Sequence, residues 1–250
     1  MSSDMISEIV CLRCVDIALL STQTSLQKPS KLQKDTLPLL LKDQDVIVES
    51  PAKSGKTTTA CISVLQKVDV SNLQCQALIL TPSHGTTMDA LEIVSALGSH
   101  SIRCHVNSDQ EHISEKSIHD KGSHIILGTP SCVQEIIGHG FLMTSSIRVI
   151  VLDRLDKMIS KGSSDAIENI LQVIPKSAQV VILLSETFTK LGDLASKLGD
   201  LTTKSMRHPS WIRHEEPEVR RHTEWNESTM LTILNHNLIS CSLQIPSFDQ

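Results

Sequence analysis

A short run of small and charged residues carries the most informative chemistry of this chain. The run Ser54–Thr57 follows an apolar, strand-like segment at 45–49 and precedes a helix-forming stretch at 58–67. In that order, loop amides and a helix N-terminus direct positive partial charge at phosphate oxygens, while a lysine and a threonine can reach the terminal phosphates and Mg²⁺. The pattern therefore predicts a phosphate-binding loop whose binding residues are Ser54, Gly55, Lys56 and Thr57.

A second candidate position ends the apolar run 149–153. Its last residue, Asp153, stands where phosphate-binding proteins of this kind place the acid on the metal side, so Thr57 and Asp153 are predicted to hold any bound Mg²⁺. The next residue is Arg154, in a place where a catalytic acid is expected. A guanidinium cannot accept a proton at neutral pH. We interpret the chain as a nucleotide-binding fold with altered chemistry.

The composition is that of a soluble intracellular protein, cytoplasmic or nuclear. Of the 250 residues 40% are hydrophobic and 20% charged, and no apolar stretch approaches the ~18 residues of a membrane span. Seven scattered cysteines suit reduced thiols, and the acidic start is unlike a secretory signal. The net charge of −5 gives no general basic footprint, and no Phe, Trp or Tyr precedes Phe141, which removes aromatic base stacking from the first half.

Short apolar runs alternate with helical patterns through most of the chain, which predicts an α/β fold with a mostly parallel sheet covered by helices on both faces. The expected strands are 45–50, 76–81, 101–106, 124–129, 149–153 and 179–185. The expected helices are 30–42, 56–67, 86–97, 132–138, 164–174 and 190–198. We expect an N-terminal extension at 1–24, a domain at 25–206, and at 207–250 a segment that begins as a linker rich in charge and proline.

Five motifs in order resemble the first RecA-like P-loop domain of the DEAD-box ATP-dependent RNA helicases, in particular the translation initiation factor 4A group. The motifs are Lys28-Pro29-Ser30-Lys31-Leu32-Gln33, Ala77 to Pro82, His124 to Pro130, Asp153-Arg154-Leu155-Asp156 and Ser185-Glu186-Thr187. The resemblance implies that Gln33 reads the adenine edge, that Asp156 belongs to the nucleotide site, and that Ser185 and Thr187 form a coupling motif. It also makes 207–250 a linker and the remnant of the start of a second domain.

The departures from this family are as informative as the matches. Arg154 replaces the catalytic acid, so no catalytic residue is expected, and loss of a general base costs ~10²–10⁴ in rate. Lys53 replaces a loop glycine, so we expect ATP or ADP with Mg²⁺ to bind weakly. On the family's RNA-binding face, His84 and Cys132 stand in place of arginines, and Ser131 stands in place of a glycine. Asp109 adds an acid on the same face. Weak or no RNA binding is expected.

Three functions stay open at this point. The first is a degenerate, helicase-inactive ribonucleoprotein- or protein-binding module, with a partner in a translation or mRNA-processing complex and without membrane association. The second is a switch that retains ATP or ADP without turning it over. The third is a slow RNA-dependent ATPase. We expect no complete second RecA-like domain, and unwinding needs two such domains to close on RNA and ATP.

Overall fold

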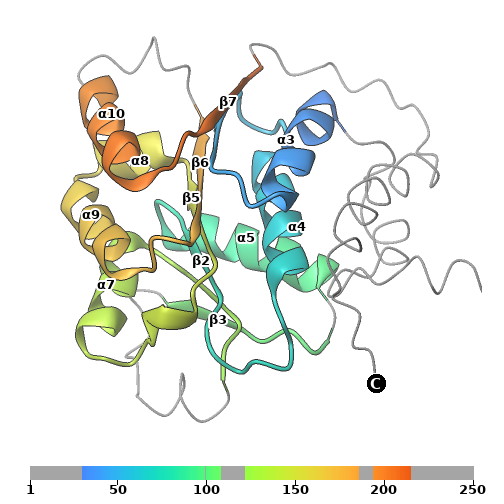
Figure 1. Cartoon of the computed structure of the whole chain (residues 1–250), viewed down its shortest axis with the longest axis vertical. Helices are drawn as coiled ribbons and strands as arrows, with labels where there is room; N and C mark the ends of the chain where they lie inside the picture. Colours follow the sequence, from blue (N-terminus) through green and yellow to red (C-terminus); the bar gives the residue numbers. More distant parts are fainter. Residues whose placement is uncertain (1–29, 99, 108–121, 186–193, 215–250) are drawn as a thin grey trace, which may run out of the picture.

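The computed structural model describes residues 30–98, 100–107, 122–185 and 194–214 of the chain, in which strands and helices alternate (Figure 1). The strands are β1 (Val46–Glu49), β2 (Ala77–Leu80), β3 (Cys104–Asn107), β4 (Ile125–Gly128), β5 (Val149–Asp153), β6 (Gln179–Leu184) and β7 (Ser210–Arg213). The helices are α3 (Lys31–Leu41), α4 (Lys56–Lys67), α5 (His84–Leu97), α7 (Pro130–Gly138), α8 (Leu155–Ser160), α9 (Ser164–Val173) and α10 (Leu194–Ser205), with a 3-10 turn η1 at Thr144–Ser146.

The seven described strands form one sheet in the order β3-β4-β2-β5-β6-β1-β7, and every neighbouring pair is parallel. All residues of β1, β2, β4, β5 and β6 are buried, as expected when a sheet is covered on both faces. Because the strands are parallel, their carboxyl ends meet at one edge of the sheet. β1 ends there immediately before Ser50, and β5 ends there at Asp153.

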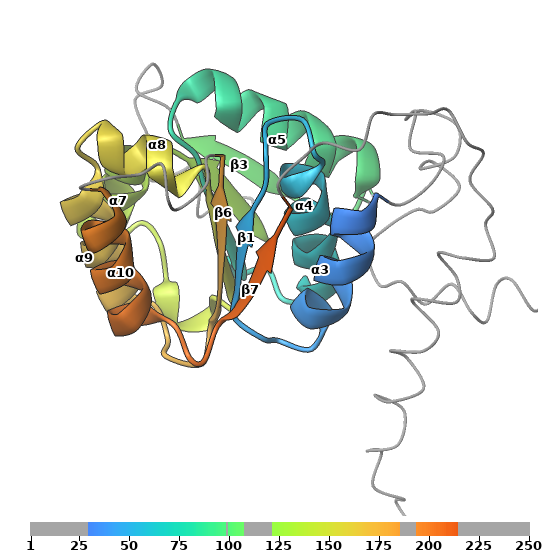
Figure 2. The same ribbon diagram turned by 90° about the horizontal axis from the view of Figure 1, so that it is seen from above.

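The helices form two layers. Figure 2 shows α3, α4 and α5 on one side of the sheet and α7, α8, α9 and α10 on the other. Alternate strand residues feed two separate cores, so that in β5 Ile150 and Leu152 pack with the second layer, whereas Val149 and Val151 pack with the first. The division arises because successive side chains along a strand point to opposite faces of the sheet. α4, the helix that follows the phosphate-binding loop, is thereby held against the middle of the sheet.

The predicted fold class is confirmed, and each of the six expected strands is present. β3 begins at Cys104 rather than at residue 101. The helix expected at 190–198 continues to Ser205, and its expected residues 190–193 lie outside the described residues. The sequence pattern does not reveal α8. The linker expected from Arg207 onward is wrong at β7, whose residues Ser210 and Arg213 pair with Val46 and Glu49 of β1. The segment Ser-Trp-Ile-Arg, beside charged and proline-containing sequence, shows neither a continuous apolar run nor apolar–polar alternation, so the pattern does not indicate a strand.

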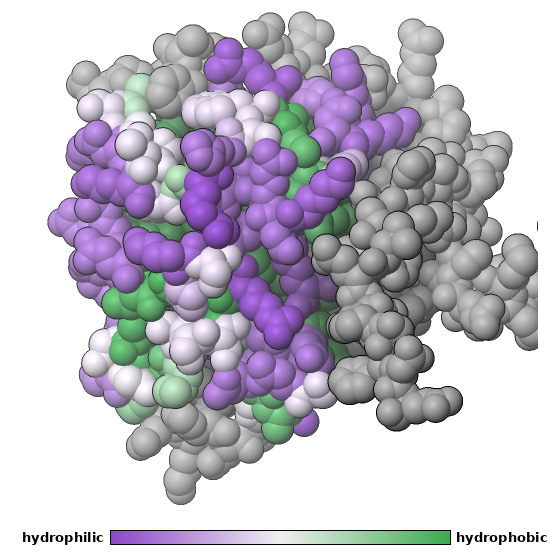
Figure 3. Space-filling view, in the orientation of Figure 1, coloured by the Kyte–Doolittle hydropathy of each residue, from purple (hydrophilic) through white to green (hydrophobic). Residues whose placement is uncertain are grey.

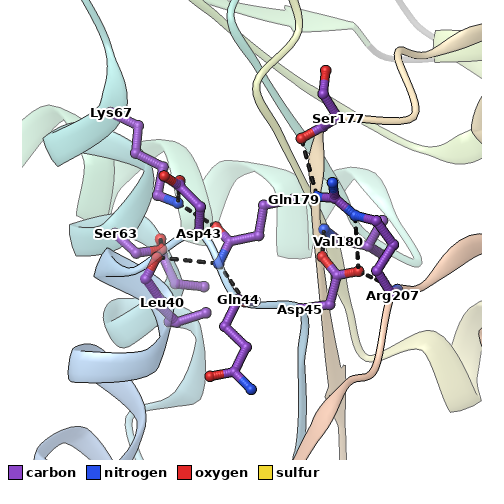
Figure 4. A network of polar contacts seen from close by, with 11 residues as sticks. Leu40, Asp43, Gln44, Asp45, Ser63, Lys67, Ser177, Gln179, Val180 and Arg207 are labelled. Carbon is purple, nitrogen blue, oxygen red and sulfur yellow. Dashed lines mark hydrogen bonds and ion pairs between the residues drawn. The ribbon is translucent and has the colours of Figure 1, made fainter.

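A polar network closes the amino edge of the sheet (Figure 4). The carboxylate of Asp45, 2% exposed, accepts hydrogen bonds from the backbone N–H groups of Val180 (2.8 Å) and Arg207 (2.5 Å). Gln179 accepts a hydrogen bond from Lys67 and donates two to backbone carbonyls in and just after α3. The network joins segments more than a hundred residues apart, since Asp45 and Arg207 are separated by 162 positions.

The face drawn in Figure 3 is mostly hydrophilic, with hydrophobic residues in small separate areas. The large hydrophobic side chains exposed among the described residues are Val70, Leu73, Met88, Met143, Val173 and Trp211. Within the described ranges, no helix has the length and apolar character needed to cross a membrane.

Candidate nucleotide-binding site

A glycine leads the chain from the loop into α4. Gly55, the N-cap residue of α4, has φ 92° and ψ 11°, a left-handed conformation that favours glycine. Its carbonyl accepts hydrogen bonds from the N–H (2.9 Å) and the hydroxyl (2.8 Å) of Thr59. The free N–H groups of the first turn of α4 remain at the loop, which is the arrangement that binds phosphate at helix N-termini.

Gln33 lies beside this loop. Its Oε1 accepts a hydrogen bond from the N–H of Ser30 (2.9 Å), and its own N–H donates to Oγ of Ser30 (3.2 Å), which makes a capping box at the start of α3. A Cβ atom added to Gly55 would lie 3.4 Å from Nε2 of Gln33. The cap therefore holds the side-chain amide with its nitrogen towards the phosphate-binding loop, and the structure brings Gln33 and Gly55 together.

Lys56 is turned back onto its own loop. Its Nζ donates hydrogen bonds to the backbone carbonyls of Ser50 and Pro51 (2.6 Å to Pro51) and to Oγ of Ser54 (3.3 Å). The residue is 7% exposed, and burial lowers the pKa of its ammonium to about 8, although nearby carboxylates oppose this shift. A phosphate must compete with these oxygens for the ammonium, because a hydrogen bond to a charged group contributes ~1.5–3 kcal/mol.

Lys53 keeps a backbone conformation suited to glycine. Its φ is 63°, in the left-handed region that costs an ordinary residue ~1–2 kcal/mol. The side chain is exposed, so it does not fill the loop. Lys53, in place of the family's loop glycine, therefore introduces backbone strain and an additional positive charge at the mouth of the loop.

Thr57 and Asp153 contact each other. Oγ1 of Thr57 donates a hydrogen bond to Oδ2 of Asp153 over 2.7 Å, and Asp153 is 2% exposed. Burial raises the pKa of Asp153, and its Oδ1 is buried without a hydrogen-bond partner. A bound cation or water would satisfy such an oxygen. One hydroxyl and one carboxylate fit the few protein ligands that Mg²⁺ takes beside phosphate oxygens.

Asp156 and Ser185 form a second contact at the same edge of the sheet. One carboxylate oxygen of Asp156 accepts a hydrogen bond from the N–H of Ser185 (3.0 Å), and the other accepts from its hydroxyl. This contact ties the start of α8 to the residue that follows β6. Thr187, the other residue expected in the coupling motif, lies outside the described residues.

Arg154 brings a positive charge between these two acids. It is the half-buried N-cap residue of α8, with φ 57° and ψ 51°. Burial is the main influence on the pKa values of Lys56 and Asp153, and the Arg154 guanidinium also acts on both, lowering each pKa. The position therefore offers a cation close to the phosphate-binding groups, and it offers no proton acceptor.

The residues expected on an RNA-binding face do not form one exposed row. His84 is half-buried in the first turn of α5, and its Nδ1 is buried without a hydrogen-bond partner. Ser131 is exposed, but Cys132 is 5% exposed and packs inside the fold. The Cys132 thiol therefore offers no exposed group where the family has a guanidinium, because its place on α7 turns it towards the core. Asp109 lies outside the described residues.

Two groups of residues at the site were not predicted from the sequence. The carbonyls of Ser50 and Pro51 hold Lys56, and backbone acceptors leave no sequence signal. Glu49, fully buried immediately before the loop, accepts a hydrogen bond from Nε of Arg213 over 3.0 Å. Glu49 is conspicuous as an acid at the end of an apolar strand. Its partner becomes visible only through the register of β1 and β7.

Similarity to known proteins identifies the family of this chain. The family model for DEAD/DEAH box helicases matches residues 30–194, and the chain belongs to that family. It is 36% identical over 196 residues to the ATP-dependent RNA helicase eIF4A of Pyricularia oryzae, which is 77% of this chain and 48% of that protein. Against eIF4A of Schizosaccharomyces pombe the identity is 35% over 195 residues, covering 77% of this chain and 48% of the relative. The chain spans about half the length of these curated relatives.

Solved structures of the same fold match over a similar region. A DEAD box protein from the hyperthermophile Methanococcus jannaschii has a TM-score of 0.72 at 22% identity, covering 79% of this chain and 52% of that one. Dbp5 of S. cerevisiae bound to RNA and ADP BeF3 has a TM-score of 0.68 at 24% identity, covering 83% of this chain and 51% of that one. At these identities the similarity establishes the fold, whereas the family model and the eIF4A relatives confirm the resemblance read from the five motifs.

Proposed function

We propose that this chain is a DEAD-box module that binds ATP or ADP and hydrolyses ATP negligibly. The observation that supports the proposal most directly is the 2.7 Å hydrogen bond between Thr57 and Asp153, next to the ammonium of Lys56. It places a hydroxyl, a carboxylate and an ammonium at the N-terminus of α4, where the helix dipole also favours phosphate.

Each polar group has a role in this proposal. Lys56 leaves the carbonyls of its loop and binds the terminal phosphates, while the first N–H groups of α4 bind phosphate oxygens. Gln33, beside Gly55, contacts the adenine base. Thr57 and Asp153 hold Mg²⁺ when it is present, and the ion then supplies positive charge to the phosphate oxygens.

Hydrolysis is where this chain departs from an active helicase. Arg154 cannot take a proton from the attacking water, and loss of a general base typically lowers the rate by ~10²–10⁴. Asp156 is engaged by Ser185 through both oxygens, so it is not free to replace the base. The proposal is therefore retention of nucleotide, as a switch, rather than turnover.

Isothermal titration calorimetry with ATP and with ADP tests the binding. We expect Lys56→Ala to weaken affinity by ~1.5–3 kcal/mol, the contribution of a hydrogen bond to a charged group. Lys176→Ala is the matched control, because Lys176 is an exposed lysine outside the site. Absence of heat and of any melting shift at millimolar nucleotide removes the proposal.

Steady-state ATP turnover, measured with and without single-stranded RNA, tests the second half of the proposal. We expect no RNA-stimulated rate above background. A rate that RNA raises and Lys56→Ala abolishes would establish the slow ATPase instead.

A second candidate function is binding of a protein partner in a translation or mRNA-processing complex. The burial of Cys132 and the absence of a guanidinium at His84 favour it over RNA binding. S. cerevisiae Dbp5, which shares the fold, has been solved bound to Nup159 and Gle1.

Fluorescence anisotropy with a single-stranded RNA is expected to give a Kd weaker than ~10 μM at physiological salt. Tight binding there would assign an RNA-clamping role.

A further inference from the structure

The phosphate site carries an excess of positive charge before any metal ion binds. The ionisable side chains in the loop and around its acids are Lys53, Lys56, Asp153, Arg154 and Asp156, which are three cations and two acids. Glu49, just before the loop, is already paired with Arg213 and adds no net charge. Asp156 uses both oxygens to accept hydrogen bonds from Ser185. In Asp153 one oxygen is held by Thr57 and one is without a partner. A divalent cation therefore meets a single available carboxylate oxygen in a positively charged surrounding.

We propose that nucleotide binding by this chain does not require Mg²⁺, and that Arg154 supplies the charge that the ion would otherwise provide to the phosphates. The inference rests on the proposed function. Thr57 and Asp153 still fit Mg²⁺ as ligands, but the neighbouring guanidinium repels a divalent cation and attracts the same phosphate oxygens. An arginine suits this role because its planar group can donate two parallel hydrogen bonds to a phosphate.

The placement of Arg154 supports this role. It directly follows Asp153, at the carboxyl end of β5, as the N-cap residue of α8. Within the described part of the chain, no hydrogen bond or ion pair engages its guanidinium. Its charge lies close enough to act on Lys56 and on Asp153. Arg154 as a residue is only partly exposed, and a charge that less solvent screens interacts more strongly with phosphate.

The test is calorimetry of the full chain with ADP and with ATP, in buffer containing either Mg²⁺ or EDTA. We expect the Kd to change by less than about threefold between the two buffers, whereas Arg154→Gln weakens binding in EDTA by about tenfold. Arg154→Asn, whose side chain tolerates the left-handed backbone, should give the same loss. Arg148→Gln is the matched control, because this exposed arginine lies at the opposite end of the same strand.

The outcomes separate this inference from the proposed function. Binding that needs Mg²⁺ and is lost in EDTA overturns the inference and leaves the proposed function standing. Binding in EDTA that Arg154→Gln and Arg154→Asn do not weaken also overturns the role of Arg154. Absence of binding in both buffers removes the proposed function itself. Melting curves of each variant without nucleotide verify that it is folded.

Discussion

The two edges of the sheet treat their buried polar atoms differently. At the amino edge, Asp45 and Gln179 use their side-chain atoms in hydrogen bonds to neighbouring segments (Figure 4). At the carboxyl edge lie four of the seven buried side-chain atoms that lack a partner in the described part of the chain: Ser50 Oγ, His84 Nδ1, Thr129 Oγ1 and Asp153 Oδ1. The amino edge has one such atom, Nε2 of His124.

The same parallel strands build both edges, so the backbone does not explain the difference. A buried polar atom without a partner costs ~1–3 kcal/mol, and such atoms are retained where a ligand meets them. In open parallel sheets, ligands bind beyond the carboxyl ends of the strands. The amino edge is therefore the structural end of this domain, and we propose the carboxyl edge as its binding end.

The largest expected effect is on the free energy of unfolding, when the same Asp→Asn substitution is made at each of the two edges. Asp45→Asn replaces an oxygen that accepts from a buried backbone N–H, so it should lower the free energy of unfolding by about 2 kcal/mol. Asp153→Asn removes a charge that burial already disfavours, and it should change stability by less than about 1 kcal/mol. Urea denaturation measures both, with exposed Asp89→Asn as control. Equal losses at Asp45 and Asp153 would contradict the contrast.

The sequence predicts most of the binding edge, because motif spacing and parallel strand order place Gln33, Thr57 and Asp153 together. It does not predict where Lys56 points, since the Ser50 and Pro51 carbonyls are backbone atoms brought close by the turn of the loop. The amino-edge network is equally hidden. Its contacts join residues such as Gln179 and Gln44, which are 135 positions apart. β7 is missed because its sequence, Ser-Trp-Ile-Arg, shows neither a continuous apolar run nor apolar–polar alternation.

The next effect concerns pH at the binding edge. With a pKa of about 8 in the free protein, Lys56 loses its proton as pH rises from 7 to 9. Bound phosphate favours the charged ammonium, so nucleotide affinity should fall by about tenfold over that range. Calorimetry at both pH values measures the change, and Lys56→Ala should abolish the dependence.

Deprotonation of Lys56 has the opposite effect on stability: nucleotide affinity falls as pH rises, whereas the free energy of unfolding increases. The pKa of Lys56 falls from 10.5 to about 8 on folding, so the unfolded chain binds more protons between these values. The Lys56 contribution to the free energy of unfolding should therefore rise with pH from 8 to 10.5. Urea midpoints of the parent chain and Lys56→Ala across this window compare the two slopes. Parallel slopes would show that the ammonium is not desolvated.

A smaller effect is expected from the strain at Lys53. Lys53→Gly relieves a left-handed lysine and should raise the free energy of unfolding by about 1 kcal/mol. Lys42→Gly is the control, because Lys42 is exposed and has φ −88°, where glycine brings no such relief. Thermal melting compares the two variants. A gain at Lys42 equal to that at Lys53 would exclude strain as the cause.

The smallest expected effect compares two buried serines. Ser50, 3% exposed, has an Oγ without a partner, whereas the Oγ of Ser63, drawn in Figure 4, donates to the carbonyl of Ala60 over 2.8 Å. Ser50→Ala removes an unsatisfied hydroxyl and should leave stability unchanged or slightly higher. Ser63→Ala removes a made hydrogen bond and should lower the free energy of unfolding by about 0.5–1 kcal/mol, since better helix propensity offsets part of the loss. Urea denaturation without nucleotide resolves the difference. A loss at Ser50 as large as that at Ser63 would mean that the carboxyl edge is satisfied like the amino edge, and that its buried polar atoms do not mark a binding site.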